Sequence, residues 1–106
     1  MALVNADDSS FEKEVLQSKE VAIVDFYADW CGPCQMMAPK FEQLAHEMQG
    51  KAKFVKLNTD TSPKTAQAYG VMSIPTLIVF KGGKVVDQTT GAIPRDNIQQ
   101  LVERHL

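Results

Sequence analysis

At residues 26–34 the chain reads Phe26-Tyr27-Ala28-Asp29-Trp30-Cys31-Gly32-Pro33-Cys34, and two hydrophobic patterns meet in this stretch. Before it, Val21–Ala28 is nearly continuous apolar sequence, which is typical of a strand covered on both faces. After it, apolar residues recur at helical spacings of three and four: Cys34, Met37, Phe41, Leu44 and Met48. The sequence therefore predicts a buried strand, a short loop, and a helix from Pro33 to about Gln49 that begins at the two cysteines.

The rest of the chain repeats this alternation of strand and helix. Further strands are predicted at residues 2–5, Lys53–Asn58, Thr76–Lys81 and Lys84–Thr89. The last two flank Gly82-Gly83, a two-residue hairpin signal, and should be antiparallel, whereas strands joined through helices should be parallel. We therefore expect one α/β domain over residues 1–106, with a central mixed β-sheet flanked by helices on both faces. The order of the strands across the sheet stays open.

Three further helices are indicated by the residues at their starts. Ser9 and Glu12 have the spacing of a capping box. Ser62 precedes Pro63 in the way that an N-cap precedes a proline at the first helical position. The last helix is expected to start at about Pro94 or Arg95. The first two of these helices should therefore be capped by their own serines.

Composition and charge narrow the range of partners. The chain has 106 residues, a net charge of −2 and scattered basic residues, so neither nucleic acid nor an anionic membrane is expected to bind. The N-terminal residues turn acidic before any apolar run develops, unlike a secretory signal. The longest apolar runs, Val21–Val24 and Leu77–Phe80, are too short to span a bilayer. We expect a soluble, cytoplasmic protein.

The two cysteines of the chain, Cys31 and Cys34, are placed for redox chemistry. Their bridge would close almost no loop, so it would add little stability through the unfolded state. Cys31 falls at a helix start, where unpaired N–H groups and the helix dipole lower the pKa of a thiol. Cys34 lies one turn later on the core-facing stripe, within reach of Cys31. We predict that an exposed Cys31 attacks a substrate disulfide and that the shielded Cys34 then resolves the mixed disulfide.

Two other interpretations of the cysteine pair remain open. Cys-x2-Cys is also the spacing of half a zinc site, although the chain has no second cysteine pair and His46 and His105 are distant in sequence. An inert structural bridge is the other interpretation, which the small size of the loop disfavours. Because the further ligands that a zinc site requires are missing near the pair, we do not expect a bound metal.

The segment around the cysteines resembles the active-site segment of thioredoxins. The resemblance covers residues 26–34 and further positions along essentially the whole chain: Asp25, Met37-Ala38-Pro39, Lys56-Leu57-Asn58, Tyr69-Gly70-Val71, Ile74-Pro75-Thr76 and Gly91. It implies the thioredoxin fold, and the Gly-Pro spacer is similar to that of reducing thioredoxins. Two positions depart from the family, because Tyr27 stands where many members have tryptophan and Gln35 stands where lysine or arginine is common.

The resemblance also implies roles for residues outside the pair. Asp25 would be a buried acid that takes the proton of Cys34, with Lys56 beside it; a strand-end acid and a solvated lysine are the alternatives. Ile74–Pro75 is expected to be cis, against the usual trans default, and Ile74 to offer backbone groups to an extended substrate segment. Residues near Cys31 would form an apolar docking rim for partners: Trp30, Gly32, Pro33, Val71, Met72, Ile74, Pro75 and Gly91.

The function that the resemblance implies is that of a protein disulfide reductase. A thioredoxin reductase would recharge it, and its clients would include enzymes that reduce peroxides, methionine sulfoxide and ribonucleotides. We expect a monomer. We also expect no bound cofactor or metal, because the Cys31–Cys34 disulfide is itself the redox group. An oxidase or isomerase is the alternative among enzymes, and a binding subunit that uses the docking rim without turnover is the alternative from another class.

Overall fold

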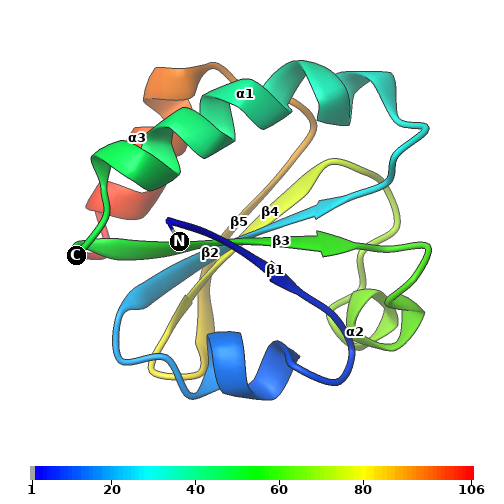
Figure 1. Ribbon diagram of the computed structural model, residues 1–106, viewed down its shortest axis with the longest axis horizontal. Helices are drawn as coiled ribbons and strands as arrows, with labels where there is room; N and C mark the ends of the chain where they lie inside the picture. The colour runs from blue at the N-terminus through cyan, green and yellow to red at the C-terminus, as the bar shows by residue number, and fades with distance from the viewer. Residues whose placement is uncertain (1) are drawn as a thin grey trace.

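A computed structural model describes residues 2–106 and arranges them in three layers. A five-stranded sheet lies in the middle, with α1 and α3 on one face and the short helical turn η1 together with α2 on the other (Figure 1). In chain order the elements are β1 (Leu3–Ala6), η1 (Glu12–Leu16), β2 (Val21–Tyr27), α1 (Gly32–Glu47), β3 (Ala52–Asn58), α2 (Pro63–Ala68), β4 (Thr76–Lys81), β5 (Lys84–Thr90) and α3 (Arg95–Glu103). The predicted α/β class and the helices on both faces are confirmed.

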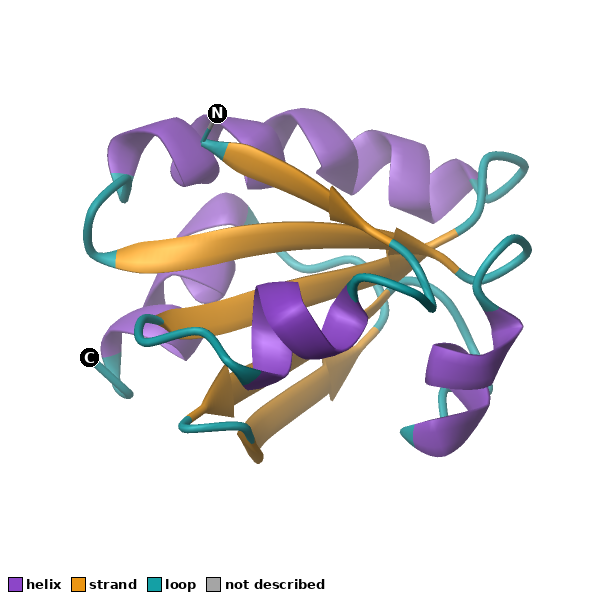
Figure 2. Ribbon diagram, turned by 60° about the horizontal axis from the view of Figure 1, so that its bottom comes forward, coloured by secondary structure: helices purple, strands orange, loops and turns teal. Residues whose placement is uncertain are grey.

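The strand order, which the sequence left open, is β1-β3-β2-β4-β5. The pairs β1–β3 and β2–β3 are parallel, whereas β2–β4 and β4–β5 are antiparallel, so the predicted mixed sheet is confirmed. Figure 2 shows the twist of this sheet between its helices. The strand before the cysteines, β2, is central and has neighbours along both edges, which explains its nearly continuous apolar sequence.

The core lies in two parts, one on each face of the sheet. Between the sheet and the helices α1 and α3, Phe41 packs against Phe54 with ring centroids 5.0 Å apart. On the other face, Phe11 packs against Phe80 with centroids 5.6 Å apart, beneath η1 and α2. All five residues of the predicted α1 stripe are buried: Cys34, Met37, Phe41, Leu44 and Met48. Within residues 2–106, no helix is both long and apolar enough to cross a membrane.

The predicted capping box at Ser9 and Glu12 is wrong. The cap belongs to Asp7, whose Oδ1 accepts hydrogen bonds from the N–H groups of Ser9 and Ser10, both at 2.9 Å. Ser10 Oγ in turn accepts from the Asp7 N–H at 3.0 Å, so the reciprocal pair lies two residues earlier than expected. The helical segment that follows, η1, is a single π-helical turn.

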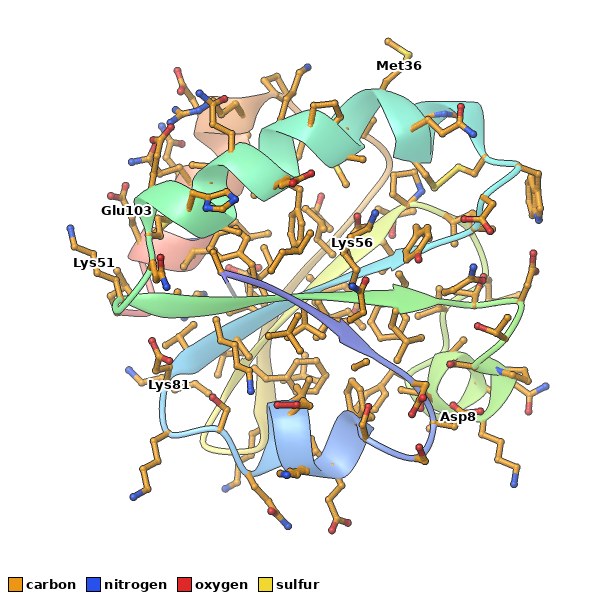
Figure 3. The ribbon with its side chains drawn as sticks, viewed as in Figure 1. Asp8, Met36, Lys51, Lys56, Lys81 and Glu103 are labelled. Atoms are coloured by element: carbon orange, nitrogen blue, oxygen red, sulfur yellow. A yellow bond between two sulfur atoms is a disulfide. The ribbon has the colours of Figure 1, made fainter. Side chains whose placement is uncertain are left out.

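The cap of α2 also differs from the prediction. Ser62 occupies the N-cap position, but its buried hydroxyl makes no hydrogen bond to the helix. Asp8 supplies the cap instead, because its carboxylate accepts from the N–H groups of Lys64 at 3.2 Å and Thr65 at 2.8 Å. Figure 3 shows Asp8 beside α2. An acid from a distant turn therefore closes this helix, which a rule about sequence neighbours does not find.

Candidate active site

The two cysteines lie where the central strand meets the longest helix. Cys31 is the N-cap residue of α1, with an extended backbone, and its carbonyl oxygen accepts the Gln35 N–H at 3.1 Å. Pro33 lies in the first turn, where backbone N–H groups have no acceptor within the helix, so the lack of an N–H on proline costs no hydrogen bond. Cys31 Sγ accepts a hydrogen bond from the Cys34 N–H at 3.2 Å. The sulfur of Cys31 thus replaces the side-chain oxygen that usually caps a helix.

Cys31 and Cys34 are joined in a disulfide, with their Cα atoms 5.2 Å apart, and Figure 3 shows this bond at the start of α1. The expectation of an exposed Cys31 is wrong for this oxidised state: 4% of Cys31 and 2% of Cys34 are exposed. Ala28 is buried with both cysteines, and the partly buried Tyr27 and Ile74 pack against them. Two chain segments therefore cover Cys31: the residues just before it, and the loop that carries Ile74. Only the first of these is near Cys31 in the sequence.

The second segment is the loop before β4. The Ile74–Pro75 peptide bond is cis, as predicted, and the Ile74 carbonyl oxygen lies 3.8 Å from Cys31 Sγ. Pro75 is buried, and its carbonyl oxygen accepts the Gly91 N–H at 2.8 Å. Gly91 has a φ of +93°, which favours glycine, so the end of β5 is fixed beside the same loop. The structure thus brings Ile74, Pro75 and Gly91 together next to the disulfide.

The predicted docking rim is only partly exposed. Trp30 is 72% exposed and Met72 is 96% exposed, and Gly32 and Pro33 are also exposed. The other members are half-buried, namely Val71, Ile74 and Gly91, or buried, namely Pro75. A contact that the sequence did not indicate orients the tryptophan: its Nε1–H donates to Asp60 Oδ2 at 2.8 Å, across 30 positions of sequence. Large exposed apolar side chains near a redox centre are typical of a protein-binding surface.

Asp25 is fully buried, and neither of its carboxylate oxygens has a hydrogen-bond partner within the described residues. In the parallel register of β2 and β3 it lies opposite Lys56, so the predicted proximity of these two residues is confirmed. Burial raises the pKa of Asp25 from 3.8 to about 7, and the charge of Lys56 opposes that rise. A carboxyl group with this pKa exchanges protons close to neutral pH.

A cavity of about 200 Å³ lies between β2, β3 and the first turns of α1. Cys34 and Lys56 both line it, together with Tyr27, Ala28, Asp29, Gln35 and Ala38. The ammonium of Lys56 stands over the Tyr27 ring, 4.2 Å from its centroid. No sequence pattern indicates this contact apart from the unusual tyrosine. A larger hollow, of about 470 Å³, lies elsewhere, near Lys13 and Gly50, and none of the predicted site residues line it.

The disulfide also bears on the zinc interpretation, because each sulfur is bonded to the other in this state. Among residues 2–106, no three histidine, cysteine or acidic side chains are grouped so that they could hold a metal ion. The cysteine pair itself offers thiol–disulfide exchange with a third sulfur.

Comparisons with known proteins agree with this geometry. The sequence model of the family described as Thioredoxin matches residues 2–104. Thioredoxin 1 of Nostoc sp. is 49% identical over 105 residues, which cover 99% of this chain and 98% of the relative. Thioredoxin 2 of Chlorobaculum tepidum is 50% identical over 101 residues, covering 95% of this chain and 93% of the relative. A thioredoxin of Staphylococcus aureus is 48% identical over 106 residues and the full length of both chains. The chain belongs to the thioredoxin family, whose members are thiol–disulfide oxidoreductases.

Proposed function

We propose that this protein is a cytoplasmic disulfide reductase that passes two electrons at a time to disulfides in other proteins. The observation that carries the proposal is the Cys31–Cys34 disulfide at the N-terminus of α1, with the Cys34 N–H donating to Cys31 Sγ at 3.2 Å. In the reduced protein the same N–H would stabilise a thiolate on Cys31, as would the helix dipole. Cys31 is then the nucleophile and Cys34 the resolving thiol.

The reaction has two exchange steps. In the first, the Cys31 thiolate attacks one sulfur of the client disulfide, a bond forms between Cys31 and that sulfur, and the other client sulfur leaves as a thiolate. In the second, the Cys34 thiolate attacks Cys31 Sγ, the Cys31–Cys34 disulfide forms, and the remaining client sulfur leaves. The client gains two electrons, and its two thiolates take up protons from water. The Cα distance of 5.2 Å already suits the intramolecular bond.

Asp25 acts in the second step. Cys34 is buried and lacks the helix-terminal stabilisation of Cys31, so its thiol must lose a proton before it attacks. Asp25 is a carboxyl group with a pKa of about 7, and no hydrogen bond from residues 2–106 competes for it. It therefore accepts the Cys34 proton as a general base, with water as the carrier between the two groups. The charge of Lys56 supports the ionised form of Asp25.

Client proteins bind at the rim around the disulfide. Trp30, Met72, Gly32 and Pro33 offer exposed surface, and the Ile74 backbone beside Cys31 offers hydrogen bonds to an extended client segment. The rim is completed by Val71, Pro75 and Gly91. The protein acts as a monomer. It needs no bound cofactor or metal, since the electrons reside in the cysteine pair itself.

A reductase must return two electrons and two protons to the oxidised pair after each turnover. We propose a thioredoxin reductase as this donor, and enzymes that reduce peroxides, methionine sulfoxide and ribonucleotides as recipients. The test is insulin reduction in the presence of NADPH and a thioredoxin reductase, with NADPH oxidation as the measured signal. The parent protein should sustain turnover, and Cys31→Ser should abolish it. A parent protein that the reductase cannot reduce would overturn the recharging step, and a reduced protein that leaves insulin intact would overturn the reductase function.

A further inference from the structure

Asp25, Tyr27 and Lys56 share one face of the sheet. Side chains alternate along β2, so Asp25 and Tyr27 point to the same side, and the parallel register sets Lys56 directly opposite Asp25. This is the side that α1 covers, and Figure 3 shows the Lys56 side chain there. A lysine side chain has many rotamers, so register alone does not keep its ammonium near Asp25. A further contact is therefore needed to hold the Lys56 ammonium in one position.

Within the described residues, the Lys56 ammonium makes a cation–π contact with the Tyr27 ring. Lys56 Nζ lies 4.2 Å from the ring centroid, well inside the range of a cation–π contact, and no carboxylate among residues 2–106 forms an ion pair with it. Burial raises the pKa of Tyr27 above its ordinary value of 10.0, so the phenol is neutral near pH 7 and its ring face attracts a cation. Both side chains are half-buried, which strengthens the contact.

The elements around Asp25 provide few other charges. Lys56 comes from β3, Cys34 comes from α1, and Asp29 comes from the loop after β2; all three line the cavity with Tyr27. On the other side, β4 sets the apolar Leu77 opposite Asp25. The Asp25 carboxylate has no hydrogen bond within the described residues, so its ionised form depends on the nearest cation. The place that Lys56 occupies therefore controls the base.

We propose that Tyr27 is a positioning residue, whose ring face holds the Lys56 ammonium on the face of the sheet that Asp25 shares and so supports the carboxylate that receives the Cys34 proton. The role of Tyr27 rests on the proposed disulfide reduction for its consequence in turnover, but the link from Tyr27 to Asp25 exists in the resting oxidised protein. The ring face makes the contact, so the hydroxyl is dispensable. The residue acts through Lys56 and touches neither the client nor the reacting sulfurs.

The effect of losing the ring follows from the strength of a cation–π contact. Without it, Lys56 spreads over positions farther from Asp25, and the pKa of Asp25 rises from about 7 by about half a unit, a threefold fall in its acid constant. At pH 7 the ionised fraction of Asp25 then falls about twofold, and so does the rate of the resolving step. Above about pH 9 Asp25 is ionised in either case, and the rates converge.

The test is the Asp25 pKa in oxidised protein, measured from the ¹³C carboxyl shift between pH 4 and 10. Tyr27→Leu should raise it by about half a unit, Tyr27→Phe should leave it unchanged, and Lys56→Met should raise it at least as far. Adding Tyr27→Leu to Lys56→Met should cause no further shift, since the ring then has no cation to hold. Lys53→Met, which removes the other half-buried lysine of β3, is the matched control and should leave Asp25 unchanged.

An unchanged Asp25 pKa in Tyr27→Leu, or an equal shift in Tyr27→Phe, would overturn the proposal. A measurement on the parent protein does not depend on any variant folding: the Lys56 ε-methylene protons should be shifted upfield by the ring current, and ordinary random-coil shifts would also overturn it. The pH profile of single-turnover insulin reduction separates the two proposals. If the pKa shifts as stated while the profile does not move, the positioning of Lys56 stands and the role of Asp25 as base fails.

Discussion

Replacement of Asp25 by alanine tests the link between stability and chemistry in this fold. Asp25 is fully buried in the central strand, and its carboxylate oxygens have no hydrogen-bond partner among residues 2–106. Burial is the larger influence on its pKa, which is raised to about 7, and the charge of Lys56 acts in the opposite direction. The group is therefore ionised above neutral pH at the expense of folding.

The sign and size follow from proton linkage. A folded pKa of about 7 against an ordinary value of 3.8 means that the folded protein binds this proton more tightly than the unfolded chain. The destabilisation is absent below about pH 4, grows between about pH 4 and 7, and is constant above. Three pKa units at about 1.4 kcal/mol each amount to about 4 kcal/mol at pH 8, and to less than about 1 kcal/mol at pH 4.

Asp25→Ala removes this penalty and leaves a small void whose cost does not depend on pH. We expect the variant to gain about 3 kcal/mol more in free energy of unfolding at pH 8 than at pH 4, relative to the parent. Urea melts of both proteins at both pH values measure the difference. Glu42→Ala, which removes an exposed acid from α1, is the control and should show no such dependence. Insulin reduction in single turnover should slow by about 10-fold or more in Asp25→Ala, because the base is lost. Equal stability changes at the two pH values, together with an unchanged rate, would mean that Asp25 is neither a buried ionised group nor the base for Cys34.

Three further predictions concern the redox pair and the local structure. Equilibration with glutathione should give a potential more reducing than about −230 mV, whereas a value near about −120 mV would indicate an oxidase. Asp8→Ala should lower the free energy of unfolding and the urea midpoint, since it removes the cap of α2; an unchanged urea midpoint would contradict this role. Gly83→Ala should cost at least about 1 kcal/mol more than Gly82→Ala. Both glycines have positive φ, but a Cβ at Gly83 would lie 2.9 Å from the Leu16 carbonyl oxygen, whereas Gly82 has open space; equal urea midpoints would exclude the clash.

The parts of the fold that the sequence predicted are those set by near neighbours in the chain. The apolar run of β2 and the stripe of α1 follow from periodicity, because each pattern repeats within one element. The β4–β5 hairpin follows from Gly82-Gly83, both of which have positive φ. The cis bond at Ile74–Pro75 came from the resemblance to thioredoxins and not from composition, since proline before a strand is usually trans.

The parts that the sequence missed depend on contacts between distant segments. Asp8 caps a helix that begins 55 positions later, at Pro63, so the local rule assigned that cap to Ser62. The strand order likewise depends on packing across the whole sheet. In the same way, the loop that carries Ile74 covers Cys31, which is why the first cysteine is less exposed in the disulfide than its place at a helix start suggested.

At the candidate site, the sequence identified the cysteines and Asp25 but not the contacts that orient their neighbours. Asp60 accepts the Trp30 indole N–H at 2.8 Å, and Lys56 stands over Tyr27. Both contacts join residues about 30 positions apart on different elements, where neither periodicity nor motif spacing carries information. Both contacts depend on the parallel pairing of β2 with β3, which brings the segments that carry these residues side by side.

In the proposed reaction Cys31 alone attacks the client and Cys34 resolves the intermediate. The most direct measurement is mass spectrometry of the covalent complex formed when reduced Cys34→Ser is mixed with a disulfide client such as insulin. We expect a stable mixed disulfide through Cys31 in that variant, and no comparable complex through Cys34 in Cys31→Ser, because only Cys31 caps α1 with its sulfur. Equal trapping through Cys34, or a Cys34→Ser protein that captures nothing, would contradict it.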